Sequence, residues 1–267
     1  MFRLDAKSGL VSKIFFYVLI LLIFIWQYGG LFWANLFKHI APWHWILATL
    51  LIAFCARIFW GQDWKNVLGL SINRWQTVFC LAALLLSLPV FYFLIHFVLV
   101  QGGFQVNASA PHLSRVLVRV FQPLNEEIVL RAILLGLLAR IISNRFALSV
   151  LLAIVFSSLH FLLYKFGILE TTLTISALLT LFFFSLAVNA LFFTFGHIGY
   201  GFALHFAWNW WRFEGDISKN GISLNEAQTF NILEGSTAVL ISVACLSILS
   251  VIGLEVHRNR RHPVPFV

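Results

Sequence analysis

The feature that most constrains this chain is a series of apolar runs, each about 20 residues long, that recur from one end of the sequence to the other. A helix of that length crosses the hydrocarbon core of a bilayer, and no polar block of domain size separates the runs. Only 10% of the 267 residues are charged, against roughly 25% in soluble domains. The sequence therefore predicts an all-α, polytopic membrane protein in which residues 1–267 form a single membrane-embedded domain.

Hydropathy predicts about eight transmembrane helices. Their approximate ranges are 14–32, 42–59, 76–100, 123–142, 146–166, 173–195, 199–213 and 236–255. The seventh is short for a membrane span. Just before the fourth, the stretch PHLSRVLVRVFQ spaces Arg115 and Arg119 one helical turn apart among apolar residues, which predicts a helix lying in the membrane interface.

The basic residues lie in the short connections between the apolar runs. The formal net charge is +8, but Lys and Arg are not gathered on one face, so membrane lipid is the expected partner and nucleic acid is not. With the N-terminus inside, the cytoplasmic connections hold more Lys and Arg than the outer ones. The positive-inside rule then favours an inner or plasma membrane protein with both termini cytoplasmic. Cys55, Cys80 and Cys245 form no CxxC pair, and predict neither a disulfide framework nor a thiolate metal site.

The stretch 125–135, NEEIVLRAILL, brings two of the ten acidic residues into an apolar run. An ionised side chain near a span centre costs about 2.5–3.5 kcal/mol on insertion, so charges there favour a functional role. Glu127 and Arg131 are four residues apart and can form an ion pair along one helix face. Glu126 is rotated by about 100° and is expected to face elsewhere, free for chemistry. Pro123, near the start of this span, would place both acids in the first turns, at the positive end of the helix dipole.

Two further polar pairs lie in later spans. The stretch FSSLHFLL places Phe156 and His160 four residues apart in span five, and ALHFAWNW places His205 and Asn209 four residues apart in span seven. With the orientation above, Glu126, His160 and Asn209 lie at similar depths toward the outer leaflet, and His205 lies about one turn deeper. The sequence therefore predicts one site between helices four, five and seven.

These residue types suit peptide hydrolysis. The reaction needs a base that activates water, a partner that positions this water or passes protons, and donors aimed at the developing oxyanion. Glu126 is the candidate base and His160 the candidate partner. His205 and Asn209 are the candidate oxyanion donors.

Other chemistries could use the same residues. Glu126, His160 and His205 could supply three zinc ligands with an open fourth position, although the sequence contains no HExxH pair. The buried carboxylates could instead carry protons or ions in a transporter or relay, which predicts transport and no cleavage. A non-catalytic immunity or scaffold protein would tolerate loss of the Glu126 carboxylate.

Three motifs, in this order on successive helices, resemble those of the CPBP family, also called Abi or type II CAAX prenyl endopeptidases. They are EExxxR (Glu126, Glu127, Arg131), FxxxH (Phe156, His160) and HxxxN (His205, Asn209). The resemblance implies a glutamate-type intramembrane endopeptidase that works without a cofactor. It assigns water activation to Glu126 and His160, oxyanion stabilisation to His205 and Asn209, and a supporting role to the remaining motif residues.

The resemblance also implies two kinds of substrate. Eukaryotic and archaeal relatives are associated with prenyl-cysteine tails on the cytoplasmic side. Bacterial relatives are linked to bacteriocin immunity, peptide maturation and the processing of C-terminal sorting tails on exported proteins. A site toward the outer leaflet suits the second kind, so the expected partner is a protein or peptide substrate with a membrane-associated tail.

The expected orientation can be measured with reporter fusions. A reporter at the C-terminus should be cytoplasmic, whereas a reporter in the loop near Gly215 should lie outside, because one span separates the two positions. Paired reporters that are active on only one side of the membrane measure both locations. A cytoplasmic position for the loop near Gly215 would overturn the outward assignment of the site.

Overall fold

The computed structural model of the protein describes residues 14–22, 41–108, 113–139, 141–166, 173–212, 215–224 and 226–260. Within them the chain is overwhelmingly helical, and the prediction of an all-α polytopic membrane protein is confirmed. After a helical segment at 14–22, the long helices are α3 (Ala41–Trp60), α5 (Arg74–Gln101), α6 (Leu113–Glu126), α8 (Arg145–Phe166), α9 (Ile175–Phe195), α10 (Gly199–Arg212) and α12 (Thr237–Arg260). The short ones are η1 (Gly61–Asp63), α4 (Trp64–Val67), η2 (Glu127–Leu135), α7 (Gly136–Leu138) and α11 (Glu226–Glu234).

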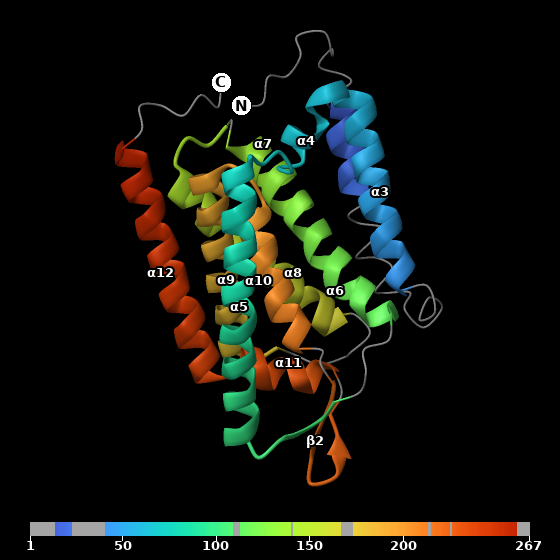
Figure 1. Ribbon diagram of the computed structural model, residues 1–267, viewed down its shortest axis with the longest axis vertical. Coiled ribbons are helices and arrows are strands. Elements are labelled where there is room, and N and C mark those ends of the chain that lie inside the picture. The colour runs from blue at the N-terminus through green and yellow to red at the C-terminus, as the bar shows by residue number, and fades with distance from the viewer. Residues whose placement is uncertain are drawn as a thin grey trace.

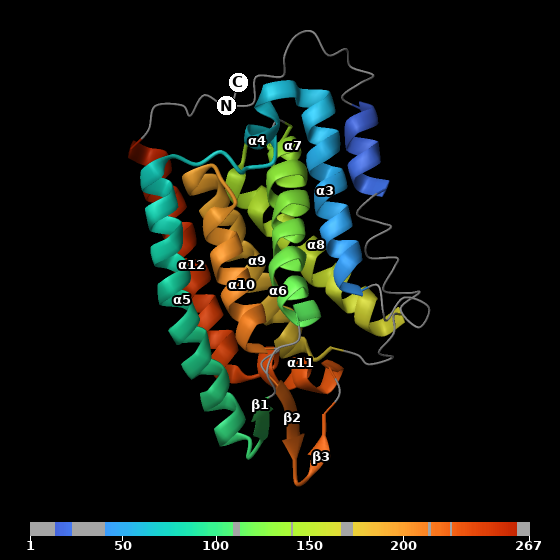
Figure 2. The ribbon, with the colours of Figure 1, turned by 45° about the vertical axis from the view of Figure 1, so that its right-hand side comes forward.

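The long helices run roughly along one axis and form a bundle (Figures 1 and 2). Helix α9 packs against α8, α10 and α12, whereas α5 packs against α10 and α12. At one end of the bundle, α11 lies across the helix ends, and α4 and α7 lie at the opposite end (Figure 1). Helix α10 therefore carries its last turns toward the end at which α11 sits.

A small antiparallel sheet adds to the helical fold at the α11 end of the molecule (Figure 2). It contains β1 (Gln105–Ala108), β2 (Gly215–Lys219) and β3 (Ile222–Ser223), in the order β1-β2-β3. Strand β1 follows α5 and β2 follows α10, with Gln105 opposite Ser218 and Ala108 opposite Gly215. The sheet thus ties the ends of two neighbouring helices together.

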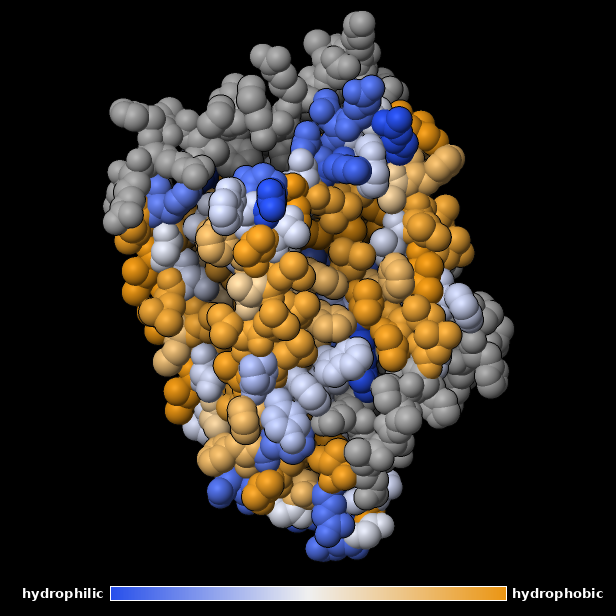
Figure 3. Space-filling model, in the orientation of Figure 1, coloured by the Kyte–Doolittle hydropathy of each residue, from blue (hydrophilic) through white to orange (hydrophobic). Residues whose placement is uncertain are grey.

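The outer surface of the bundle is apolar around its middle. Figure 3 shows hydrophobic residues covering this part of the visible face, with strongly hydrophilic residues gathered toward the two ends. In the 18-residue apolar stretch of each helix, 17% of α5 is buried, compared with 61% of α9. Leu85, Leu86 and Phe93 of α5 are each 69% exposed. Exposed apolar side chains on this scale are suited to lipid, so α5 is a lipid-facing helix and α9 a central one.

Five described helices are long and apolar enough to cross a membrane: Trp43–Val67, Arg74–Gln101, Arg145–Leu162, Ile175–Phe195 and Thr237–His257. They correspond to predicted spans two, three, five, six and eight. Span one is described only over residues 14–22, span seven is a helix of 14 residues, and span four carries buried charges. The total of eight spans stays a prediction.

Local sequence sets where two of the long helices begin and end. Helix α5 begins with a capping box, in which the Asn73 side chain accepts from the Gln76 backbone N–H and the Gln76 side chain accepts from that of Asn73. Helix α9 is capped at its start by Thr174, whose hydroxyl accepts from Ala177 N–H, and at its end by Gly196, with φ of 76°. That left-handed conformation favours glycine, and it turns the chain into α10.

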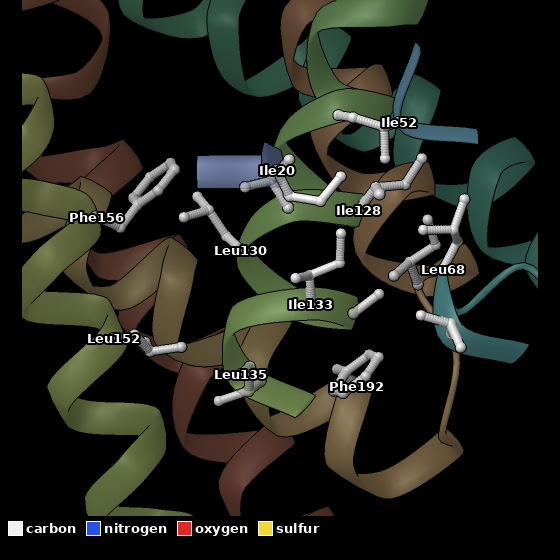
Figure 4. Close-up of a cluster of buried hydrophobic side chains, with 14 of the residues drawn as sticks. Ile20, Ile52, Leu68, Ile128, Leu130, Ile133, Leu135, Leu152, Phe156 and Phe192 are labelled. Atoms are coloured by element: carbon white, nitrogen blue, oxygen red, sulfur yellow. The ribbon is translucent and has the colours of Figure 1, made fainter. Parts of the chain in front are cut away.

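Two buried clusters hold the bundle together. One joins the segment 14–22, α3, η2, α8 and α9, and its members include Ile20, Ile52, Ile128, Leu152 and Phe192 (Figure 4). The other joins α5, α9, α10, α11 and α12, and its members include Phe91, Phe184, Trp208, Leu233 and Val243.

Two predictions about the fourth span are wrong. The stretch containing Arg119 is not a separate interfacial helix but the first part of α6, which runs without interruption into η2 and α7. Pro123 lies inside α6 rather than at its start. Glu126 and Glu127 are therefore several turns from the N-terminus of the helix, where its dipole has little effect. The partners of these carboxylates must come from other helices.

Candidate active site

The two adjacent glutamates lie where the helix changes its geometry. Glu126 ends α6, and Glu127 begins a π-helix of nine residues that extends to Leu135. A π-helix is wider than an α-helix because its hydrogen bonds join residues five apart, and such segments are frequent at functional sites. Glu126, Glu127 and Arg131 are all at most 1% exposed. These three charges therefore need partners inside the protein.

Arg131 is one of the largest fully buried side chains and binds three other side chains at once. Its Nη1 lies 3.4 Å from Glu127 Oε1, which confirms the predicted ion pair. Its Nε donates to Asn189 Oδ1 at 3.2 Å and its Nη2 to Ser185 Oγ at 3.1 Å. Asn189 Nδ2 donates in turn to the carbonyl of Ser149 at 3.0 Å. The guanidinium thus connects η2 to α9 and, through Asn189, to α8.

His205 of α10 lies between the two carboxylates. Its Nδ1 is 3.0 Å from Glu127 Oε1, and its Nε2 is 3.7 Å from Glu126 Oε2. An ionised carboxylate only accepts hydrogen bonds, so Nδ1 carries the proton and donates a hydrogen bond to Glu127. Phe184 of α9 packs edge-on against the imidazole, with ring centroids 5.4 Å apart. Glu127 therefore links Arg131 to His205 and orients the His205 ring.

The meeting of both glutamates at one imidazole corrects the prediction that Glu126 faces elsewhere. Glu126 Oε1 accepts a hydrogen bond from Gln122 Nε2 at 3.1 Å. Glu126 Oε2 makes no hydrogen bond within the described parts of the chain, and is 3.7 Å from His205 Nε2. One oxygen of this buried carboxylate is thus held by its own helix while the other lies beside an imidazole nitrogen.

The second motif lies on α8. His160 Nδ1 is 3.0 Å from the carbonyl of Phe156, and because a carbonyl only accepts, Nδ1 is the protonated nitrogen. In the neutral ring the lone pair is then on Nε2. The Phe156 ring lies 4.4 Å from the His160 ring and 5.0 Å from the Arg131 guanidinium, measured to its Cζ. Phe156 therefore packs between the ion pair and the second histidine.

A cavity of about 40 Å³ brings these motifs together. Its lining includes Glu126, Phe156, His160, His205 and Asn209, from three motifs on three stretches of chain. Both buried clusters contribute to its wall, so the cavity lies where they meet. A water needs roughly 10–15 Å³ of such space and two to four polar partners, so the cavity has room and partners for water.

Several lining residues were not identified from the sequence. They are Gln122, Thr180, Leu181, Phe184, Trp208, Phe230, Glu234 and Val243. Helix α11 supplies two of them: the Phe230 ring stacks against His160 at 6.5 Å, and Glu234 Oε1 accepts from Trp208 Nε1 at 3.1 Å. Gln122 was detectable, because it stands four residues before Glu126. No local pattern announces the α11 residues, since they reach the cavity through tertiary packing.

The arrangement also bears on metal binding. Among the residues with a described position, no three His, Cys, Asp or Glu side chains are grouped so that they could hold a metal ion, and this applies to Glu126, His160 and His205. Glu127 and Arg131 occupy the space on the Nδ1 side of His205.

The cavity thus brings a buried carboxylate and two histidines from separate helices to one place. Residues 108–211, which run from β1 to the end of α10, match the family model described as Type II CAAX prenyl endopeptidase Rce1-like. The resemblance predicted from the three motifs is thereby confirmed: this part of the chain is a domain of that family, which is one of CAAX-protease-type hydrolases. No curated protein and no solved structure matches the chain.

Gly201 of α10 gives the Glu127 side chain its room. A Cβ at Gly201 would lie 2.7 Å from Glu127 Oε2 and 2.5 Å from Val188 Cγ1, both too close. In a helix, replacing glycine by alanine normally stabilises by about 1 kcal/mol. Gly201→Ala should instead lower the free energy of unfolding by about 1–3 kcal/mol, because it overpacks the ion-pair network.

Gly253 of α12 is the matched control for this prediction. A Cβ there meets nothing within 4 Å, so Gly253→Ala should be neutral or stabilising. Denaturant unfolding of both variants in detergent measures the difference. Equal stability changes in the two variants would show that α10 does not approach Glu127 so closely.

Proposed function

We propose that the protein is a glutamate-type intramembrane endopeptidase that cleaves a peptide bond near the membrane-associated tail of its substrate. The observation that carries this proposal is the single cavity lined by Glu126, His160, His205 and Asn209. The match of residues 108–211 to a CAAX protease family supports the same reaction class. Hydrolysis inside a membrane requires a protected place for water, and the cavity is large enough to provide it.

In the proposed reaction, Glu126 and His160 hold and activate a water molecule. The water donates one proton to Glu126 and hydrogen-bonds His160 Nε2 with the other. Its oxygen forms a bond with the carbonyl carbon of the substrate, and the carbonyl oxygen takes the negative charge. When the carbon–nitrogen bond breaks, a proton passes from Glu126 or His160 to the leaving amine. The products are a carboxyl terminus and a free amine.

His205 and Asn209 serve as the oxyanion donors. The Nδ1–H of His205 already donates a hydrogen bond to Glu127. To donate a second one from Nε2 to the oxyanion, the ring must be an imidazolium. The site then holds two negative charges, on Glu126 and Glu127, and two positive charges, on Arg131 and His205. Proton transfer to Glu126 moves one negative charge from Glu126 to the oxyanion. The total charge of the site remains zero through the step, which suits a surrounding of low dielectric constant.

The supporting residues hold this arrangement in place. Arg131 holds the Glu127 carboxylate in place, and Glu127 keeps the His205 ring oriented. Phe156 packs against both the Arg131 guanidinium and the His160 ring. The mechanism uses no metal and no other cofactor. Zinc at Glu126, His160 and His205 is the alternative, and it predicts loss of activity on chelation.

We also propose that the cavity faces the outer leaflet and that the substrates carry non-cytoplasmic tails. The cavity contains residues of α11, so it lies toward the sheet end of the bundle, and α12 ends at the opposite end (Figures 1 and 2). A cytoplasmic C-terminus would therefore place the cavity toward the outer side. Membrane-anchored sorting tails of exported proteins are the proposed substrates, with prenylated cytoplasmic tails as the alternative.

Replacing the base tests the proposal. Glu126→Gln keeps the size and the hydrogen-bonding shape of the side chain but removes the base, so it should lower cleavage by at least about 100-fold. Substrates are found by comparing the membrane and secreted proteins of cells that carry wild-type protein or Glu126→Gln. C-terminal fragments should persist uncleaved in the variant, and the purified wild-type protein should cleave the corresponding tail peptides in the presence of a chelator.

Glu255→Gln, on the last turns of α12 and away from the cavity, is the matched control and should cleave at the wild-type rate. Proton or ion flux through reconstituted vesicles without any cleavage would favour a relay instead. Identical protein profiles in wild type and Glu126→Gln cells would favour a non-catalytic scaffold. Either result would refute the endopeptidase assignment.

A further inference from the structure

Thr180 of α9 is a residue of the cavity wall to which no motif assigns a role. It is 3% exposed, and its hydroxyl finds no hydrogen-bond partner among the described residues. It stands one turn before Phe184, which packs against His205. A buried hydroxyl without a partner is unfavourable, and such groups in folded proteins call for a specific explanation.

Three other helical threonines show the hydrogen bond that Thr180 would ordinarily make. A threonine inside a helix can donate to the carbonyl four residues earlier. Thr49 donates to Trp45 at 2.8 Å, Thr77 to Asn73 at 3.0 Å, and Thr194 to Ala190 at 2.8 Å. Thr180 makes no such bond to its own helix. The Thr180 hydroxyl, which lines the cavity, therefore does not donate to the helix carbonyl that a threonine usually binds.

A second unsatisfied group in the same wall points to what Thr180 binds. Glu126 Oε2 is buried, lines the cavity and also lacks a hydrogen-bond partner in the described parts of the chain. An unpaired acceptor and an unpaired hydroxyl around one small cavity are satisfied together by a water molecule. We infer that the Thr180 hydroxyl is a third ligand of the water that Glu126 and His160 hold, an inference that rests on the proposed function.

Three ligands would fix the orientation of this water. Its two hydrogens are directed to Glu126 and to His160 Nε2, and one of its two lone pairs accepts from Thr180 Oγ–H. The remaining lone pair is then aimed at the substrate carbonyl carbon. Orientation of this kind accelerates the chemical step more than it strengthens substrate binding. Thr180 is thus a catalytic residue that contacts the nucleophile and takes no part in proton transfer.

Thr180→Val tests the inference, because valine has nearly the same shape and lacks only the hydroxyl. Cleavage of the tail peptide identified with Glu126→Gln should show a kcat about 10- to 100-fold lower with KM nearly unchanged. Thr180→Ser retains the hydroxyl and should stay within about threefold of wild type. Thermal unfolding gives an independent readout: Thr180→Val should leave Tm nearly unchanged, because the hydroxyl bonds no other protein group among the described residues.

Thr194→Val on the same helix is the matched control, since its hydroxyl is bonded to a carbonyl and lies outside the cavity lining. It should leave kcat unchanged. Wild-type kcat in Thr180→Val, with Glu126→Gln inactive, would overturn the role of Thr180 and leave the proposed function standing. A lowered kcat with an equally lowered Tm would assign Thr180 a structural role. Full activity in both Thr180→Val and Glu126→Gln would overturn both proposals.

Discussion

The buried ion pair between Glu127 and Arg131 is the interaction on which the rest of the site depends. Both side chains are at most 1% exposed, so neither charge is stabilised by water. Burying a charge is tolerable only with good geometry and further hydrogen bonds, and Arg131 obtains these from Asn189 and Ser185. The pair thereby fixes η2 against α9. It also places a fixed negative charge beside His205, which no apolar packing could do.

That fixed charge organises the chemistry proposed for the cavity. Glu127 orients the His205 ring, and His205 lies beside Glu126. In the proposed mechanism, two carboxylates of adjacent residues thus take different roles from their surroundings, one structural and one chemical. Both carboxylates reach the same imidazole because each lies beside a different ring nitrogen. Glu126 and Thr180 each have a buried polar atom at the cavity without a hydrogen-bond partner among the described residues, and water is proposed to act at these two atoms.

Much of the fold follows from sequence because the physical signals are local. Apolar runs of membrane length predict helices, and the i,i+4 spacing of Glu127 and Arg131 predicts their ion pair, which the structure confirms. The same spacing was visible for Ser185 and Asn189 in span six and would have identified the partners of Arg131. Glu126 was expected to face away from Glu127, because adjacent residues of a helix diverge, but the His205 ring presents one nitrogen to each carboxylate.

Other features of the site depend on contacts between distant segments. The polar segment after α10 predicts a loop, but it folds into a strand pair and α11, whose Phe230 and Glu234 reach the cavity. Thr180 carries no signal in the sequence, because an apolar helix commonly contains a threonine bonded to its own backbone. Only the missing hydrogen bond of its hydroxyl distinguishes Thr180. Membrane orientation likewise depends on charges in the connections rather than on packing.

A double-mutant cycle between Glu127 and Arg131 tests the central claim most directly. The free energy of unfolding in detergent is measured for wild type, Glu127→Gln, Arg131→Met and the double variant. Each single change should lower it by about 3–5 kcal/mol, because each leaves an uncompensated buried charge. The double variant should lose much less than the sum of the two, because it leaves no charge unpaired. Losses that simply add would contradict the account, since the two side chains would then act independently.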